Sequence, residues 1–277
     1  MNRLCVIGDP VERSLSPTMH NAALEYLGLG KEYFFGRLRV PRDGLEQFAW
    51  KFRKGEFSGA CVTMPYKETI IPFLDMLADS AAQAGAVNTV TRMDDVLEGH
   101  NTDGTGCVRA LQAAGVDVNG SRFVILGAGG AARAAAFALA TAGAGSIHIL
   151  NRTAARARGV ADSVRKVASG EVAAGSLGNM REALMAADAL INATPVGMPG
   201  MPENVIVPGE LLRQGMTVLD MVYDPLETPL LRYARKAGAR AVPGTEMLLH
   251  QGAAQFKLFT GRDAPIDIMK KALEGEL

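Results

Sequence analysis

Three clusters of polar residues in the first half of the chain carry side chains that acid–base chemistry uses. A lysine such as Lys67 can donate a proton to an oxygen and stabilise the negative charge that develops there, and a carboxylate such as Asp103 can orient the lysine. Each cluster also has a simpler interpretation, with Ser16 as a helix cap, Lys67 as a surface lysine and Asp103 as the cap of the following helix. The clusters are Ser14-Leu-Ser16-Pro17, Thr63-Met-Pro-Tyr-Lys67, and Asn88-Thr89 with Asn101-Thr-Asp103-Gly104.

A second candidate site is the glycine-rich run that follows an apolar stretch at residues 122–126. Gly127 permits a tight turn, and Gly129 lets the backbone approach a pyrophosphate. The helix that begins after these glycines offers free N–H groups and a positive dipole end to the same anion. A strand before the glycines and a helix after them is the context that a dinucleotide site requires. The simpler alternative is a turn of small residues in an ordinary α/β unit.

The end of the next strand indicates which dinucleotide would bind. An NAD site usually carries Asp or Glu there, which binds the ribose 2′-hydroxyl. This chain instead has Asn151-Arg152-Thr153 followed by Arg156, with no carboxylate. Arginines bind a 2′-phosphate through charge-assisted bonds, so the sequence predicts NADP unless these residues are only a solvated helix start. A polar pocket beside the nicotinamide is what a dehydrogenase needs, and the three polar clusters supply candidates for it.

Strand-like and helix-like patterns alternate along the whole chain and must position these residues. Leu45, Phe48, Ala49 and Phe52, for example, have the spacing of one helix face. The alternation predicts an α/β fold in which helices cover the faces of a sheet. Strands are expected at 3–8, 33–40, 58–63, 87–93, 97–100, 122–126, 146–150, 171–174, 189–193 and 217–222, and helices from Ser16 onward, at 45–52, 74–83, 244–260 and 265–274.

Length, charge and hydropathy limit the class of protein. A chain of 277 residues is near the limit of a single core, so two domains are expected, with a composition shift near Gly104 as the boundary. The 29 basic and 29 acidic residues give a net charge of 0, which argues against a nucleic-acid partner. No apolar run is long enough to span a bilayer, so no membrane partner is expected.

Cysteine and histidine usage bears on metal binding and on location. Cys5, Cys61 and Cys107 lie far apart and form no CxxC motif, which suits reduced thiols in the cytoplasm and argues against structural zinc. The four histidines form no ligand pair, so no metal site is predicted.

Taken in order, these motifs resemble those of the shikimate dehydrogenase family from end to end. The resemblance implies reversible NADPH-dependent reduction of 3-dehydroshikimate to shikimate, a small-molecule substrate of the chorismate pathway to aromatic amino acids, by a monomer or homodimer. It also implies two α/β domains separated by a cleft: a substrate domain, 1–103 completed by 244–277, and a Rossmann-type NADP domain, 104–243. The matching segments are Ser14-Leu-Ser-Pro17, Val62-Thr-Met-Pro-Tyr-Lys67, Gly85-Ala-Val-Asn-Thr89, Asn101-Thr-Asp-Gly104, Gly127-Ala-Gly-Gly-Ala131, Asn151-Arg-Thr153, Asn192-Ala-Thr-Pro-Val-Gly-Met198, Gly244 and Gln251.

The same resemblance implies a role for each matching position. Lys67 and Asp103 match the catalytic pair. Ser14 and Ser16 match the hydroxyls that hold the substrate carboxylate, assisted by Tyr223. The positions that match partners of the ring hydroxyls are Thr63, Asn88, Asp103 and Gln251. Those that match cofactor contacts are Asp79, Gly127, Ala128, Gly129, Gly130, Ala131, Asn151, Arg152, Thr153, Arg156, Met221 and Gly244.

One position departs from the pattern, and two other functions stay open. Cys61 stands where the family commonly has an asparagine that lines the substrate pocket, and strand alternation would turn Cys61 to the same side as Thr63. The alternative for Cys61 is a buried thiol that packs as a small apolar group. A quinate or dual quinate/shikimate dehydrogenase is the nearest other enzyme, and a catalytically idle NADP-binding sensor is the alternative from another class.

Overall fold

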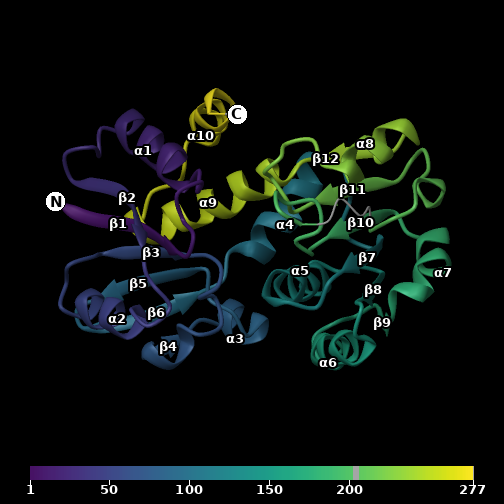
Figure 1. Ribbon diagram of the computed structural model, residues 1–277, viewed down its shortest axis with the longest axis horizontal. Helices are drawn as coiled ribbons and strands as arrows, with labels where there is room; N and C mark the ends of the chain where they lie inside the picture. The colour runs from purple at the N-terminus through teal and green to yellow at the C-terminus, as the bar shows by residue number, and fades with distance from the viewer. Residues whose placement is uncertain (202–205, 277) are drawn as a thin grey trace. The chain divides into compact units, whose positions relative to one another are not determined.

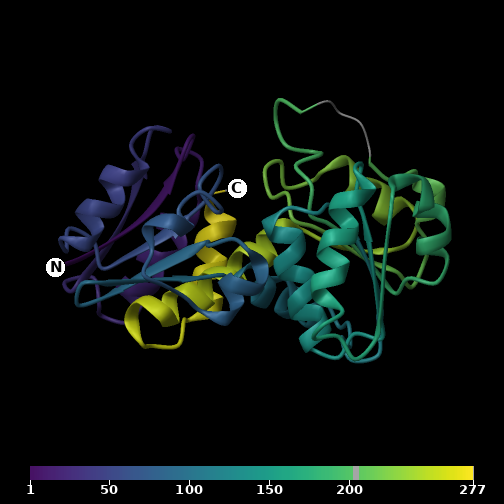
Figure 2. The ribbon, with the colours of Figure 1, turned by 90° about the horizontal axis from the view of Figure 1, so that it is seen from below.

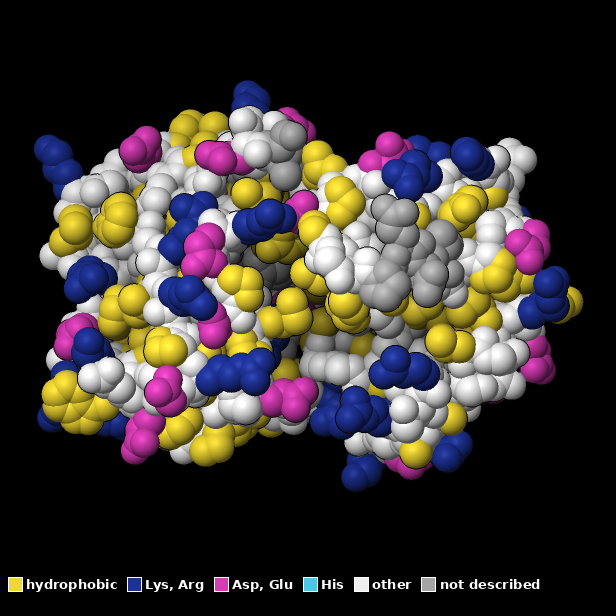
Figure 3. Space-filling view, viewed as in Figure 1, with side chains coloured by type: hydrophobic (Ala, Val, Ile, Leu, Met, Phe, Trp, Pro, Cys, Tyr) yellow, Lys and Arg dark blue, Asp and Glu magenta, His cyan; other side chains and the backbone are white. Residues whose placement is uncertain are grey.

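The computed structural model describes residues 1–201 and 206–276, which form two compact α/β units (Figure 1). The first unit is Met1–Asp103 together with Leu249–Leu277, and the second is Gly104–Leu248. Each unit has its own sheet, and the predicted α/β class is confirmed. In the described parts of the chain, no helix has the length and apolar character to cross a membrane. Figure 3 shows positive and negative side chains interspersed over the face in view.

The sheet of the first unit is mixed, with the order β2-β1-β3-β5-β6-β4. Strands β1, β2 and β3 are parallel, β5 and β6 form an antiparallel hairpin, and β4 runs parallel to β6. The strands are β1 (Asn2–Gly8), β2 (Tyr33–Arg39), β3 (Gly59–Val62), β4 (Met76–Leu77), β5 (Thr89–Met93) and β6 (Val96–His100). The helices are α1 (Ser16–Tyr26), α2 (Leu45–Arg53), α3 (Asp79–Ala84), the part of α9 (Gly244–Thr260) from Leu249 onward, and α10 (Ile266–Gly275).

Alternation along the central strands sends side chains to two different cores of this unit, one on each face of the sheet. Figure 2 shows the ribbon of the unit from a second direction. Cys5 and Ile7 of β1 pack on the side of α2, whose Phe48 and Phe52 fill that core. Leu4 and Val6 of β1 face the other way and pack with Cys61 of β3. Cys5 and Cys61 therefore lie on opposite faces of one sheet. The terminal helices cover the second face, where α1 and α10 pack against each other.

The sheet of the second unit is fully parallel, with the order β12-β11-β10-β7-β8-β9. Numbered from its first strand, this is the order 3-2-1-4-5-6 of a Rossmann fold, read from the β9 edge. Helices α4, α5 and α6 pack on one face, and α7 and α8 on the other. The strands are β7 (Arg122–Leu126), β8 (Ser146–Leu150), β9 (Glu171–Gly175), β10 (Ala189–Asn192), β11 (Thr217–Asp220) and β12 (Arg240–Val242). The helices are α4 (Asp103–Ala113), α5 (Gly130–Thr141), α6 (Ala154–Val164), α7 (Met180–Met185) and α8 (Pro229–Lys236), besides the start of α9.

The prediction of a helix at residues 74–83 is wrong for the first half of this segment. The chain is extended there and adds β4 to the sheet, and α3 begins only at Asp79. The reason is a set of tertiary bonds that a periodicity argument cannot see. The Asp75 carboxylate accepts hydrogen bonds from the Leu97 amide at 2.8 Å and from Arg53 at 2.7 Å, which holds this segment beside β6.

His20 of α1 is a buried polar side chain in an apolar environment. Its ring stacks on Phe35 with centroids 4.5 Å apart, and Phe256 and Phe259 of α9 lie around it. Among the residues described, neither ring nitrogen has a hydrogen-bond partner. Burial lowers the pKa of His20 to about 3, an effect that the nearby Gln255 opposes only in part. The folded protein therefore keeps this imidazole neutral at pH values where the unfolded chain protonates it.

We predict that His20→Leu makes the protein more resistant to acid. A group whose pKa is lower in the folded state gives its full stability above the unfolded pKa of 6.5 and loses it as the pH falls towards 3. From pH 7 to pH 5, this linkage removes about 2 kcal/mol from the free energy of unfolding of the wild type. Urea denaturation at both pH values measures it. An equal fall in the wild type and in His20→Leu would contradict the prediction.

Candidate active site

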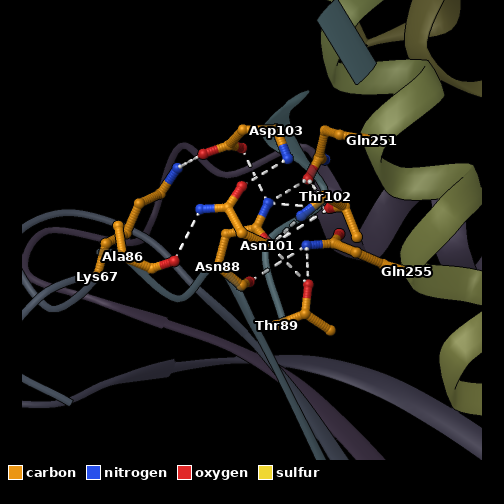
Figure 4. Close-up of polar contacts among 9 residues, drawn as sticks. All are labelled: Lys67, Ala86, Asn88, Thr89, Asn101, Thr102, Asp103, Gln251 and Gln255. Atoms are coloured by element: carbon orange, nitrogen blue, oxygen red, sulfur yellow. Dashed lines mark hydrogen bonds and ion pairs between the residues drawn. The ribbon is translucent and has the colours of Figure 1, made fainter. Parts of the chain in front are cut away.

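The Lys67 and Asp103 side chains form an ion pair in the first unit (Figure 4). The Lys67 Nζ atom lies 2.6 Å from Asp103 Oδ2. Lys67 follows the turn after β3, whereas Asp103 is the first residue of α4, separated from the end of β6 by Asn101 and Thr102. The Lys67 side chain is 25% exposed and the Asp103 side chain only 6%, so the ammonium reaches solvent from a buried anchor.

Asn88 fixes the second oxygen of the Asp103 carboxylate. Its Nδ2 atom donates to Asp103 Oδ1 at 2.8 Å. The amide can face only one way, because the Thr102 backbone N–H donates to Asn88 Oδ1 at 2.9 Å and a backbone N–H cannot accept. The Asp103 backbone N–H in turn donates to Asn101 Oδ1 at 3.0 Å. Side chain and backbone of Asp103 are therefore both held before any ligand binds.

Gln251 joins this cluster from α9. Its Oε1 atom accepts from Asn88 Nδ2 at 3.3 Å and from Thr102 Oγ1 at 3.4 Å. The structure thus brings together four predicted site residues that lie far apart in sequence: Lys67, Asn88, Asp103 and Gln251. We call these four the Lys67–Asp103 cluster.

Sequence reasoning missed three members of the surrounding network. Asn101 and Thr102 lie inside the motif Asn101-Thr-Asp-Gly104, in which the sequence predicts a role for Asp103 only. Gln255 lies one helical turn after Gln251, a spacing that places both on one face of α9. That spacing was the only signal for Gln255 in the sequence.

The two serines and Thr63 lie at the carboxyl ends of neighbouring strands, without a hydrogen bond to the Lys67–Asp103 cluster within the described residues. Thr63 follows β3, and its backbone N–H donates to the Ile7 carbonyl at 3.0 Å. Ser14 lies in the loop after β1, where Arg37 donates two hydrogen bonds, of 3.0 and 2.8 Å, to its carbonyl. The prediction that Ser16 caps α1 is wrong: Leu15 takes that position, and no side-chain cap bond forms. The Ser16 hydroxyl is therefore not used for capping.

Cys61 is a core residue of this unit. Its side chain is 3% exposed and packs beside Leu4, Val6 and Phe35. Its Sγ atom donates to Gln255 Oε1 at 3.0 Å. Burial raises the pKa of the thiol well above its usual value. The structure thus favours the buried thiol over a thiol that faces a substrate.

The glycine loop of the second unit lies at the carboxyl end of β7, beside β10, where the strand order reverses. Gly127 has a φ of +114°, and a Cβ atom there would lie 3.0 Å from the Ala193 carbonyl oxygen. Gly129 differs, since a Cβ atom there would meet nothing within 4 Å. The helix α5 then begins at Gly130 without a side-chain cap, which leaves its first N–H groups available. An open backbone beside free N–H groups fits a pyrophosphate.

The end of β8 carries two arginines and no carboxylate. Arg152 and Arg156 are exposed, and neither forms an ion pair within the residues that the structure describes. Asn151 turns the chain here, as its Nδ2 atom donates to the Thr153 carbonyl at 3.0 Å. These side chains fit the phosphate of NADP better than the bare ribose of NAD.

The other residues predicted to contact the substrate or the cofactor lie in the second unit, except for Asp79. Ala128 and Ala131 belong to the glycine loop and the start of α5, and Met221 and Tyr223 follow β11. Gly244 begins α9, where a Cβ atom would lie 2.6 Å from the Val222 carbonyl oxygen. Asp79 begins α3 in the first unit.

Asp220 was missed by sequence reasoning and holds the loop that carries Met221 and Tyr223. This fully buried carboxylate accepts from Asn192 Nδ2 at 2.9 Å, from the Val222 amide at 3.1 Å and from Thr228 Oγ1 at 2.6 Å. Burial raises the pKa of Asp220, against the opposing effect of these hydrogen bonds.

Comparison with known families and proteins gives matches along the chain. The shikimate dehydrogenase substrate binding domain matches residues 6–90, the shikimate / quinate 5-dehydrogenase family matches 109–219, and the shikimate 5′-dehydrogenase C-terminal domain matches 244–274. The chain is 46% identical to shikimate dehydrogenase (NADP(+)) from Moorella thermoacetica, over 98% of this chain and 92% of that protein.

Two solved structures show the range of similar proteins. Shikimate 5-dehydrogenase from Thermus thermophilus, in complex with NADP(H) and shikimate, has a TM-score of 0.89 and 38% identity, with 100% of each chain covered. Quinate dehydrogenase from Corynebacterium glutamicum, in complex with NAD, has a TM-score of 0.88 and 31% identity, with 99% of each chain covered.

We predict that two alanine substitutions in the glycine loop act differently. Gly127→Ala should lower the free energy of unfolding by about 1–3 kcal/mol, because it forces a side chain into a positive-φ conformation against Ala193. Gly129→Ala should change stability by less than about 0.5 kcal/mol, because its backbone is extended and the space is open. It should nevertheless weaken dinucleotide binding roughly tenfold, the effect of about 1.4 kcal/mol.

Thermal unfolding and titration with NADP measure the two effects. If Gly129→Ala binds NADP as the wild type does, the pyrophosphate does not lie against this loop.

Proposed function

The chain belongs to the shikimate dehydrogenase family, and we propose that it catalyses the reversible NADPH-dependent reduction of 3-dehydroshikimate to shikimate with Lys67 and Asp103 as its catalytic pair. The observation that carries this proposal is the 2.6 Å ion pair between a partly exposed ammonium and a buried carboxylate. An NADP-binding protein without catalysis has no use for such a pair.

The proposed chemistry moves one proton at the Lys67 Nζ atom. The nicotinamide, when bound, supplies the hydride to the ketone carbon. Lys67 then donates a proton to the carbonyl oxygen and stabilises the negative charge that develops there. In the reverse direction, the same nitrogen accepts the proton of the ring hydroxyl. Asp103, held by Asn88, keeps the ammonium oriented towards that oxygen.

The remaining polar groups of the first unit are proposed to bind and orient the substrate. Asn88, Thr63 and Gln251 would hydrogen-bond the ring hydroxyls, with Asp103. Ser14 and Ser16 would hold the carboxylate at the start of α1, where the helix dipole favours an anion, and Tyr223 would assist.

In the second unit, we propose that NADP binds along the carboxyl ends of the parallel strands. The glycine loop from Gly127 to Ala131 would hold the pyrophosphate. Arg152 and Arg156, with Asn151 and Thr153, would hold the 2′-phosphate. The further cofactor contacts proposed from the resemblance are Asp79, Met221 and Gly244.

Quinate oxidation is the second candidate activity, since a quinate dehydrogenase is among the similar structures. That protein was solved with NAD, whereas the end of β8 here has two arginines in place of an acidic residue. We also propose a cytoplasmic location, which the wide spacing of the three cysteines and the lack of a CxxC motif in the sequence support. A monomer or homodimer stays a prediction from the resemblance.

A spectrophotometric comparison tests substrate and cofactor together. We predict nicotinamide reduction with shikimate and NADP, and much weaker activity with quinate or with NAD. Arg152→Ala/Arg156→Ala should lose much of the preference for NADP, since each charge-assisted bond contributes roughly 1.5–3 kcal/mol. Arg158→Ala removes an exposed charge from the same helix and should keep the preference.

Equal losses with NADP and NAD in the double variant would mean that the arginines hold the helix or the pyrophosphate. Preference for quinate in the wild type would replace the proposed substrate.

We predict that Lys67→Ala lowers kcat by a factor of about 10²–10⁴ and changes KM for shikimate little. An interaction made only in the transition state lowers kcat and kcat/KM together. Lys257→Ala is a matched control, because Lys257 also pairs with a carboxylate, Asp263 at 2.7 Å, but does so on the surface. Steady-state kinetics decide the matter: a raised KM with an unchanged kcat would make Lys67 a binding group only.

A further inference from the structure

Both the NH₂ group and the oxygen of the Gln255 side-chain amide, on α9, form hydrogen bonds within the protein. Its side chain is 2% exposed. The Nε2 atom donates to the Asn88 carbonyl at 3.2 Å and to Thr89 Oγ1 at 3.0 Å. The Oε1 atom accepts from the Cys61 Sγ atom at 3.0 Å. The amide thus connects a strand of the sheet to the segment that carries Asn88, as Figure 4 shows for the bonds to Asn88 and Thr89.

The orientation of the Gln255 amide is fixed by chemistry. The Asn88 backbone carbonyl can only accept, so the NH₂ group of Gln255 must face it. The amide oxygen then faces Cys61, and it needs a proton donor there. A thiol can donate, although weakly, whereas a thiolate cannot. Burial raises the pKa of Cys61 and so keeps the proton on sulfur.

The direction of donation continues from Gln255 to the Lys67–Asp103 cluster. Thr89 accepts from Gln255, so its own hydroxyl proton is free to go to Asn88 Oδ1, 2.8 Å away. Asn88 then turns its NH₂ group to Asp103 Oδ1 at 2.8 Å. The donors therefore run in one order, from Cys61 through Gln255, Thr89 and Asn88 to Asp103.

We propose that Gln255 is a positioning residue for the Lys67–Asp103 pair, and that the Cys61 thiol helps to hold its amide in place by donating a hydrogen bond to the amide oxygen. Within the described residues, Gln255 has no hydrogen bond to Lys67 or Asp103, so it acts through Asn88 and Thr89. The inference rests on the proposed function, since it assumes that the pair is catalytic.

A second buried cysteine provides a matched control. Cys5 lies on β1, next to β3, and is as buried as Cys61, with 2% against 3% exposure. It packs on the opposite face of the sheet, and no hydrogen bond of its thiol occurs in the part of the chain that the structure describes. Replacing either thiol with alanine removes the same buried atoms, but only Cys61→Ala removes a donor to Gln255.

The test is kinetic and uses the full-length protein with shikimate and NADP. Cys61→Ala should lower kcat about threefold to tenfold, the effect expected for one hydrogen bond, with KM for NADP unchanged. Cys61→Ser keeps a donor and should restore kcat to within about twofold of the wild type. Cys5→Ala should lower the melting temperature as Cys61→Ala does, but leave kcat unchanged. Gln255→Met, close in size to Gln255 but without either polar group, should lower kcat at least about tenfold.

Three results would overturn the proposal: the same kcat in Cys61→Ala and Cys5→Ala, failure of Cys61→Ser to restore kcat, or a wild-type kcat in Gln255→Met. If Cys61→Ala does not fold, Gln255→Met and Cys61→Ser still decide. Lys67→Ala, assayed alongside, separates a failure of the catalytic pair from a failure of the positioning role of Gln255. An active Lys67→Ala protein refutes the catalytic pair itself, whereas an inactive one beside a normal Gln255→Met protein refutes only the positioning role.

Discussion

The ion pair between Lys67 and Asp103 is the interaction on which the rest of the site depends. A buried carboxylate is stable only when charged or polar donors surround it. Asp103 meets this requirement with Lys67 on one oxygen and Asn88 on the other. Asn88 must in turn be fixed, which the Thr102 amide, Thr89 and Gln251 accomplish. The hydrogen bonds of one carboxylate thus connect the segment after β3, the start of β5, the segment after β6 and α9.

Strand direction explains why the candidate residues meet although they are distant in sequence. In parallel α/β sheets, ligands bind at the carboxyl ends of the strands. In the first unit, the loops after β1 and β3 carry the serines and the segment from Thr63 to Lys67. In the second unit, the loops after β7 and β8 carry the glycines and the arginines. Each unit therefore presents one set of functional groups at one edge of its sheet.

The sequence predicted local features well and tertiary ones poorly. Strands 122–126 and 146–150 match β7 and β8 because runs rich in apolar residues end at glycine or at polar residues. The segment 74–83 failed because Asp75 forms bonds to Arg53 and Leu97 that periodicity does not contain. Gln255 went unrecognised because a glutamine on a helix has meaning only once its neighbours Asn88 and Cys61 are known. The motifs named Lys67 and Asp103, but only the structure shows that their side chains touch.

A crystal structure with shikimate and NADP bound is the direct test of the acid–base role of the Lys67–Asp103 pair. This role predicts that the Lys67 Nζ atom lies within hydrogen-bond distance, about 2.6–3.2 Å, of the ring-hydroxyl oxygen that becomes the ketone oxygen. It also predicts that Asp103 remains bonded to both Lys67 and Asn88. A complex in which that oxygen is bound by other groups, with Lys67 turned to solvent, would contradict the role of this pair as the acid–base device of the enzyme.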